Sequence, residues 1–205
     1  MPRQALSDVQ LAETRARIVA EAGRIVLREG YAALSMRSLA KAVGLTAGAL
    51  YRYFPTKQHV LMGYCADALD ALTEQLRRIE TEEGEPLRAI ERMMVEYGTF
   101  ALSDPDRFRV VFLDPEVGRI ELTDPKTLDG YRVLQAAVDR AQGAGLFRPM
   151  AADDIARLLI ASVHGIVVMA VTIREIDFSD AGTLVAAAAR TMLRGLAVAP
   201  DEVGR

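Results

Sequence analysis

The sequence predicts an all-α protein of about nine helices, in which a three-helix unit with a helix-turn-helix precedes a larger helical domain. Three observations predict this fold class. Apolar residues recur at helical spacing along most of the 205 residues. Prolines and glycines fall between these periodic stretches, where helices begin and end. Outside the short run VVFL at 110–113, no segment alternates convincingly between apolar and polar residues, so no sheet is expected.

The first helix is expected to run from about residue 7 to Glu29, with Gly30 as its terminator. Ser7 and Gln10 form a possible capping box at its start. Its inner stripe consists of Ile18, Ala22, Ile25 and Val26. This stripe predicts that one face of the helix is buried.

Residues 35–54 contain two short helical patterns that meet at a glycine. In a helix-turn-helix, the two helices cross so closely that one facing position must be small, and the turn requires a residue that tolerates positive φ. Ala40 and Gly44 meet these two requirements, and Leu50 fills the buried position of the second helix. Because three steric demands coincide, the spacing favours a helix-turn-helix over a plain helical hairpin.

Thr46 is expected to cap the second helix of this motif, and Pro55 to stop it. Small residues at the helix start would let its backbone approach a surface closely, and the hydroxyl and guanidinium groups beyond them can reach phosphate oxygens. A recognition helix lies in the major groove of DNA in this way. The outward positions of the second helix are Ala47, Gly48, Tyr51, Arg52 and Tyr53. Arg37 on the first helix can extend towards guanine or a phosphate.

Residues 29–61, EGYAALSMRSLAKAVGLTAGALYRYFPTKQHVL, resemble the TetR family of transcriptional regulators. The resemblance rests on Gly30-Tyr31, the Met-Arg-x-Leu-Ala run, Val43-Gly44-Leu45, Leu50-Tyr51-x-Tyr53-Phe54 and Lys57. The sequence departs from the family pattern in two places. Small residues occupy 47–49, where many members carry larger polar residues that touch bases, and His59 stands where a glutamate often follows the lysine.

The resemblance implies a DNA-binding domain at 10–56 and an effector-binding and dimerisation domain at 57–199. The residues expected to contact DNA are Arg37, Thr46, Ala47, Gly48, Tyr51, Arg52, Tyr53 and Lys57. The charge distribution agrees with this division. Residues 1–57 hold nine Lys and Arg against four Asp and Glu, whereas the rest holds sixteen against twenty-four. A basic N-terminal part suits a polyanionic partner, although an excess of this size also occurs by chance.

The remaining helices are expected at 57–80 with Thr56 as a cap, from Pro86 past Ala101, at 125–143, at 152–176 and at 180–199. Pro86 suits the first turn of its helix. A short segment, FRVVFLD, follows Asp106, and residues 115–125 are interpreted as a loop. The last two helices are apolar on more than one face, which predicts a second subunit against them. The resemblance implies the same four-helix dimer interface, and Ser162-Val163-His164-Gly165 resembles a subtype with a Trp-His-Gly signature.

A set of soft and aromatic residues on the middle helices is the candidate pocket for a small apolar effector. Its members are Met93, Met94, Tyr97, Phe100, Phe108, Phe112, Tyr131 and Met169, together with His164. The same pattern is also typical of plain core, and a lone histidine on an apolar helix is commonly a hydrogen-bonded interface residue. Both interpretations stay open on the sequence alone.

An enzyme is not expected, because the chain has two histidines, one cysteine and no metal-ligand or phosphate-loop spacing, so no metal or cofactor is expected either. No signal peptide is recognised, and the apolar segment 158–173 is too short to cross a bilayer, which predicts a cytoplasmic protein without a membrane partner. The expected function is a homodimeric repressor that binds palindromic double-stranded DNA and is released by a small effector. The alternative is a helical ligand-binding protein or enzyme whose helix-turn-helix no longer contacts DNA.

Overall fold

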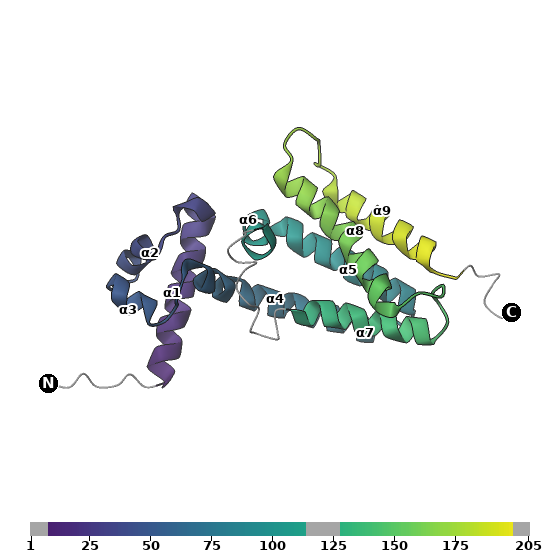
Figure 1. Cartoon of the computed structure of the whole chain (residues 1–205), viewed down its shortest axis with the longest axis horizontal. Helices are drawn as coiled ribbons and strands as arrows, with labels where there is room; N and C mark the ends of the chain where they lie inside the picture. The colour runs from purple at the N-terminus through teal and green to yellow at the C-terminus, as the bar shows by residue number, and fades with distance from the viewer. Residues whose placement is uncertain (1–7, 114–127, 199–205) are drawn as a thin grey trace. The chain divides into compact units, whose positions relative to one another are not determined.

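The computed structural model describes residues 8–113 and 128–198, and it confirms the all-α prediction (Figure 1). Within these ranges the only extended pairing is a single antiparallel bridge between Phe147 and Ala197. The described α-helices are α1 (Asp8–Glu29), α2 (Met36–Ala42), α3 (Ala47–Tyr51), α4 (Lys57–Glu82), α5 (Pro86–Ser103), α6 (Pro105–Phe108), α7 (Asp129–Gly143), α8 (Ala152–Thr172) and α9 (Ala181–Leu196). A 3₁₀ turn at Tyr31–Ala33 and a π-helix at Arg109–Leu113 complete them.

The described helices divide into two compact units. Residues 8–68 and 106–113 form the first unit, and residues 69–105 and 128–198 form the second. The division passes through α4, whose residues up to Ala68 pack with the first unit. The domain ranges expected from the sequence, 10–56 and 57–199, remain predictions.

The core of the first unit is built where α1 meets the helix-turn-helix and the start of α4. The expected stripe on α1 is buried, and Ile18 and Ala22 have no exposed surface. Gly30 ends α1 with a φ of 81°, as expected for a residue that leaves the right-handed helix. A Cβ at Gly23 would lie 2.4 Å from Cε2 of Tyr64, so α1 and α4 approach closely at this glycine. The buried members of this core are Ile18, Ala22, Ile25, Val26, Leu34, Leu39, Ala40, Leu50, Phe54, Val60, Leu61 and Cys65.

The second unit is a helical bundle in which α5 packs against α7, α8 and α9, and α8 and α9 run side by side (Figure 1). α5 begins at Pro86, which is tolerated in the first turn because that turn needs no N–H donor. α8 turns one stripe to the core, consisting of Ile155, Ala156, Leu159, Val163, Val167 and Val171. Its opposite side carries Leu158 and Met169, which are exposed.

Several predicted boundaries differ from the observed ones. The run at 110–113 belongs to the π-helix Arg109–Leu113 and is not a strand. α8 ends at Thr172, four residues before the predicted 176, because Ile173 adopts an extended backbone. A turn follows, in which the Asp177 carboxylate accepts the Ser179 N–H at 2.8 Å. α9 ends at Leu196, not at 199. The capping residue Ser7 and the predicted loop at 115–125 lie outside the described residues.

Candidate nucleic-acid interface

The helix-turn-helix has the geometry that its spacing predicts. Gly44 has a φ of 72°, and no heavy atom lies within 4 Å of the Cβ position of this glycine, so the backbone conformation alone requires it. Ala40 is 3 % exposed and Leu50 is fully buried. The Leu45 N–H donates to the Ala40 carbonyl at 2.8 Å and closes the turn between α2 and α3.

Both short helices have side-chain caps. Ser35 accepts the Ser38 N–H at 3.1 Å, and the Ser38 hydroxyl in turn accepts the Ser35 N–H at 3.1 Å, so these two serines form a capping box for α2. Sequence reasoning missed this cap because the N3 position of a capping box, three residues after the N-cap, is usually Glu or Gln and here is Ser38. Thr46 accepts the Ala49 N–H at 3.2 Å, which confirms the predicted cap of α3.

α3 is shorter than predicted. The sequence predicted a helix up to Pro55, but the regular helix ends at Tyr51. The last turn tightens, because the N–H groups of Arg52 and Tyr53 donate to carbonyls three residues earlier. Arg52 is therefore the C-cap residue, and Tyr53 lies in the turn that leads to α4.

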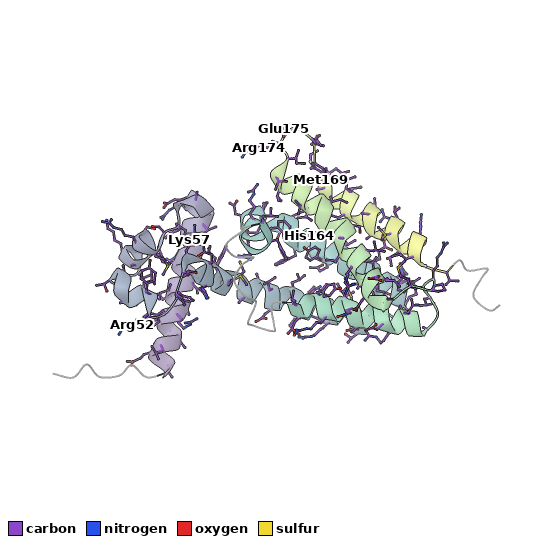
Figure 2. All side chains as sticks on the ribbon, viewed as in Figure 1. Arg52, Lys57, His164, Met169, Arg174 and Glu175 are labelled. Carbon is purple, nitrogen blue, oxygen red and sulfur yellow. The ribbon has the colours of Figure 1, made fainter. Side chains whose placement is uncertain are left out.

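Most of the predicted DNA-contacting residues lie on the surface of the first unit. Arg37, Thr46, Ala47, Gly48, Tyr51 and Arg52 are exposed, whereas Tyr53 and Lys57 are half-buried. Tyr51 is 52 % exposed although it is a large aromatic residue. A Cβ added at Gly48 would meet no heavy atom within 4 Å, so packing inside the unit does not explain the glycine. Figure 2 labels Arg52 and Lys57 in this unit.

Thr56 caps the N-terminus of α4, as predicted. Its Oγ1 lies 2.8 Å from Nδ1 of His59 and accepts the His59 N–H at 3.4 Å. His59, which departs from the family pattern, therefore supports this cap through its ring. The first turn of α4 contains Lys57 and no acidic residue. A helix start of this kind favours anions, because the backbone N–H groups and the lysine carry charge of the same sign.

The electrostatic character of the motif comes from an absence of acids as well as from its cations. From residue 30 to residue 66 the sequence contains no Asp or Glu, whereas it contains Arg37, Lys41, Arg52 and Lys57. Lys41 is exposed on α2 and was not among the residues expected to contact DNA. The acid-free stretch is the sequence signal that identifies it. An excess of exposed cations over acids favours the binding of a polyanion.

The predicted ligand-binding residues are divided between the two units. Met93 and Met94 are each 1 % exposed in the core of the second unit. Phe100 and Tyr131 are half-buried, and Met169 is 39 % exposed on α8, where Figure 2 labels it with His164. Phe108 and Phe112 belong to the first unit, where their ring centroids lie 4.9 Å apart. Whether these residues line a pocket or form plain core stays a prediction.

One pair in the second unit is joined directly. The Tyr97 hydroxyl lies 2.6 Å from Nδ1 of His164, and the two rings stack with centroids 6.2 Å apart. Burial raises the pKa of Tyr97 above its ordinary value and lowers the pKa of His164 below its ordinary value. Both side chains are therefore neutral near pH 7.

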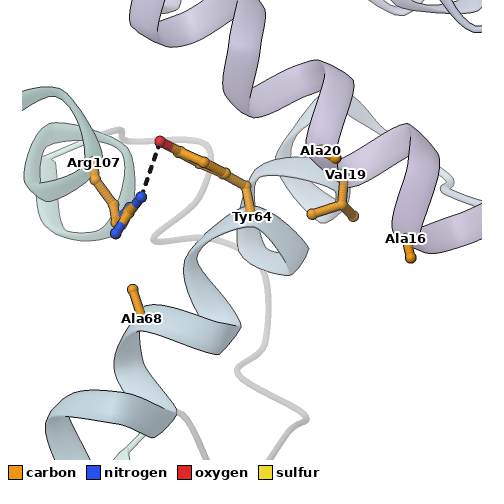
Figure 3. Close-up of a pocket in the computed structure, with 6 residues that line it drawn as sticks. All are labelled: Ala16, Val19, Ala20, Tyr64, Ala68 and Arg107. Atoms are coloured by element: carbon orange, nitrogen blue, oxygen red, sulfur yellow. Dashed lines mark hydrogen bonds between the residues drawn. The ribbon is translucent and has the colours of Figure 1, made fainter.

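The first unit also contains an open groove of about 450 Å³ (Figure 3). Small side chains of α1 form one side of it, and Tyr64 and Ala68 of α4 and Arg107 of α6 form the other. Arg107 donates to the Tyr64 hydroxyl at 3.0 Å, and its guanidinium carbon lies 4.7 Å from the ring centroid. None of the nine predicted ligand-binding residues lines this groove.

The sequence predicted neither a metal site nor a membrane span, and the predicted length of the apolar segment 158–173 proves wrong, because α8 extends over 21 residues. The described residues contain no cluster of three or more His, Cys, Asp or Glu side chains that could hold a metal ion. α8 has the length and composition of a membrane span, and 33 % of its apolar window is buried inside the chain. The core helix of a soluble protein can have the same length and composition, so these two properties do not by themselves show a membrane span. Within the second unit α8 packs against α5, α7 and α9.

Sequence models of two known domains match this chain. A model described as "Bacterial regulatory proteins, tetR family" matches residues 18–62, which include every residue expected to contact DNA. A model described as "Tetracyclin repressor-like, C-terminal domain" matches residues 90–196. Together the two matches cover most of the chain. The Trp-His-Gly subtype expected from Ser162–Gly165 is not specified by these descriptions and stays a prediction.

Two curated relatives carry different names. The nucleoid occlusion factor SlmA of Marinomonas sp. (strain MWYL1) is 27 % identical over 139 residues, which is 65 % of this chain and 71 % of that protein. The HTH-type transcriptional repressor KstR of Rhodococcus jostii (strain RHA1) is 33 % identical over 92 residues, which is 44 % of this chain and 40 % of that protein. The chain thus matches less than half of the length of KstR.

Solved structures share the fold over nearly the whole chain. A protein of unknown function from Rhodococcus sp. RHA1 superimposes with a TM-score of 0.71 at 24 % identity, over 97 % of this chain and 100 % of that chain. The transcriptional repressor FadR of Thermus thermophilus, solved with lauroyl-CoA, superimposes with a TM-score of 0.70 at 19 % identity, over 91 % and 97 %. At these identities the similarity concerns the fold alone.

Proposed function

The chain belongs to the tetR family of bacterial regulatory proteins, and from this premise we propose that it is a transcriptional repressor that binds palindromic operator DNA as a homodimer. The observation that carries the proposal is the exposed, acid-free surface of the helix-turn-helix. There Gly48 leaves the backbone of α3 open, and Arg37, Tyr51 and Arg52 stand on the surface.

Each part of this surface has a proposed role on the duplex. Ala47 and Gly48 let the start of α3 sink into the major groove, because they carry almost no side chain. Arg37 reads a base edge, for which a guanidinium beside guanine O6 and N7 is the commonest arrangement. Tyr51, Arg52, Tyr53 and Lys57 hold phosphate oxygens and fix the register without reading sequence. Thr46 keeps its oxygen on the α3 cap and presents its hydroxyl proton towards the duplex.

The homodimer is proposed from the uncovered apolar side of the last two helices. Leu158, Met169 and Leu184 are between 39 % and 43 % exposed in the single chain. Large aliphatic side chains gathered on two adjacent helices favour burial against another protein surface. A second copy of α8 and α9 would provide that surface with two-fold symmetry, which matches a palindromic site. A second copy of the chain is favoured over a lipid bilayer as the partner of this apolar side, because α8 begins with Asp153 and Asp154 and contains His164. We therefore place the protein in the cytoplasm.

The second unit is proposed to bind a small, apolar effector that releases the protein from DNA. The candidate contacts in this unit are Met93, Met94, Tyr97, Phe100, Tyr131, His164 and Met169. Phe108 and Phe112 belong to the first unit and are left out of this proposal. The ligand-bound structure of the similarly folded FadR supports an effector for this fold, but it does not identify the ligand here. An effector acts by favouring a conformation in which the two DNA-binding surfaces no longer match the operator. We propose no catalytic activity for the chain, because its sequence has two histidines, one cysteine and no metal-ligand or phosphate-loop spacing.

Selection of bound sequences from random duplexes by the purified protein tests this function. We expect one palindromic consensus and an affinity that falls steeply with salt concentration. On the selected site, Lys57→Ala should weaken binding to all sequences and make the salt dependence shallower by about 0.9 for each phosphate that is no longer neutralised. Tyr51→Phe should weaken binding with an unchanged slope. Arg88→Ala, which removes an exposed charge from α5, is the control.

Two results would reject the proposal. If no duplex is bound with both sequence preference and salt dependence, the chain is a ligand-binding protein or an enzyme whose helix-turn-helix has another use. If Lys57→Ala and Arg88→Ala have equal effects on affinity and slope, the proposed phosphate contact at the start of α4 is wrong.

A further inference from the structure

The turn that follows α3 is attached to α1 by one arginine. Nη1 of Arg15 donates to the backbone carbonyl of Tyr53 at 2.5 Å, across 38 positions of sequence. The guanidinium carbon of the same side chain lies 4.3 Å from the ring centroid of Phe54. The Phe54 ring is 2 % exposed, so its position is fixed by the core of the first unit. Arg15 therefore makes two contacts at once, with the backbone of the turn and with a buried aromatic ring next to it.

The chemistry of this contact suits the end of a helix. Carbonyl groups at a helix C-terminus have no partner within the helix and carry partial negative charge, so a cation is favourable there. The planar guanidinium can stack on a ring while one of its N–H groups donates to the carbonyl, which a lysine ammonium cannot imitate. α3 has only five residues, and helices this short do not persist in water by themselves. Thr46 secures the start of α3, and Arg15 secures the turn after it.

We propose that Arg15 is a positioning residue for DNA recognition, which fastens the Tyr53–Phe54 turn to α1 and thereby sets the orientation of Tyr51 and Tyr53. This inference rests on the proposed function, because those two tyrosines are proposed phosphate contacts. Arg15 acts through the turn and not by adding its own charge to the duplex. Its effect on affinity therefore requires the planar shape of the guanidinium, and a lysine, which keeps only the charge, should not replace it.

The first test compares Arg15→Lys, Arg15→Ala and Arg17→Ala on the operator selected by the unmodified protein. Arg17 is an exposed arginine of the same helix, so its variant controls for the loss of one positive charge. We expect Arg15→Lys and Arg15→Ala each to bind about tenfold more weakly, with an unchanged salt slope, and Arg17→Ala to stay within about twofold. Arg15→Lys binding like the unmodified protein, or a slope about 0.9 shallower in Arg15→Ala, would overturn the proposal in favour of a direct charge contact.

A second test asks whether Arg15 acts through the turn. If it does, Tyr53→Phe should weaken binding in the unmodified protein but change it less than about twofold when added to Arg15→Lys, because the tyrosine has already lost its position. Additive losses would contradict this. Arg15→Lys retains the charge of the helix and is the variant on which this test relies, should Arg15→Ala not fold.

A third measurement needs no DNA, so it separates a failure of this inference from a failure of the proposed function. The N–H groups of Tyr53 and Phe54 donate to the Leu50 carbonyl at 2.9 and 3.1 Å. We expect hydrogen exchange at these two amides to become about tenfold faster in Arg15→Lys and to stay unchanged in Arg17→Ala. Equal exchange in the two variants would refute the attachment of the turn by Arg15, whether or not the protein binds DNA.

Discussion

Gly98 lies on α5 where that helix meets α8 and α9, and replacing it with alanine tests the packing of the second unit. The new Cβ would lie 2.5 and 3.0 Å from the two methyl groups of Val185 and 3.2 Å from Cγ1 of Val163. Both valines are buried, at 1 % and 0 % exposure, and their branched side chains have little rotamer freedom. The contacts can be relieved only if the helices separate.

The size of the effect follows from two opposing terms. Overpacking of a core destabilises by about 1–3 kcal/mol. Alanine stabilises a helix interior relative to glycine by roughly 0.5–1 kcal/mol. We therefore expect a net loss of about 1 kcal/mol, and of at most about 2.5 kcal/mol, in the free energy of unfolding, which lowers Tm by roughly 2–4 °C for each kcal/mol in a protein of this size.

The assay is urea unfolding followed by circular dichroism, with Gly195→Ala as the matched control. Gly195 lies in α9, and a Cβ there would meet no heavy atom within 4 Å, so this variant should be unchanged or slightly more stable. Val185→Ala removes both methyl groups that the new Cβ would meet, so the double variant Gly98→Ala/Val185→Ala should lose less than the two single changes together. Additive losses, or a Gly98→Ala variant as stable as Gly195→Ala, would refute the close approach of α5 and α9.

Four further predictions concern function and assembly. Gly48→Ala should leave the stability of the folded protein unchanged or raise it by up to about 1 kcal/mol, while it weakens operator binding. Thermal unfolding measures the first effect and fluorescence anisotropy the second. Tighter binding would contradict the close approach of α3 to DNA. Arg37→Ala should relax the preference at one base position by about 1–3 kcal/mol, and an unaltered consensus in a repeated selection would exclude base reading. Burial holds the pKa of His164 below its ordinary value of 6.5, so the unfolded chain binds a proton that the folded chain does not; the free energy of unfolding should therefore fall as the pH decreases below about 6.5 and level off below the folded-state pKa. Urea titrations from pH 5 to 8 should show less of this fall in His164→Gln and all of it in His59→Gln, and identical profiles would reject the assignment. Leu184→Glu, which places a charge on the exposed apolar side of α9, should shift sedimentation from dimer to monomer, and an unchanged dimer would move the interface elsewhere.

Features of the fold that depend on local rules were predictable from the sequence. Gly30 and Gly44 end their elements with positive φ, Thr46 caps α3, and Pro86 opens α5. Each of these residues imposes its conformation on its own neighbours, so one sequence is sufficient to place it. The acid-free stretch at 30–66 would have identified Lys41 in the same way.

Features that depend on contacts between distant segments could not be predicted. The Arg15–Tyr53 hydrogen bond joins residues on different helices, and no spacing rule relates them. The pairing of Tyr97 with His164 spans 67 positions. The candidate ligand-binding residues illustrate the same limit, because helical periodicity identifies the buried face of a helix but does not distinguish a filled core from a cavity. For this reason the predicted ligand-binding residues include Phe108 and Phe112, which belong to the first unit, together with residues of the second unit.

Because α3 is so short, its folding limits the ways in which the protein can dissociate from DNA. A helix of five residues is not stable by itself in water. Leu50, the fully buried side chain of α3, belongs to the core of the first unit. Local unfolding of α3 would remove Leu50 from this core. We therefore expect α3 to unfold only together with the rest of the first unit. Release by a bound effector should accordingly displace an intact element, and the amide of Leu50 should stay protected in the liganded, DNA-free protein.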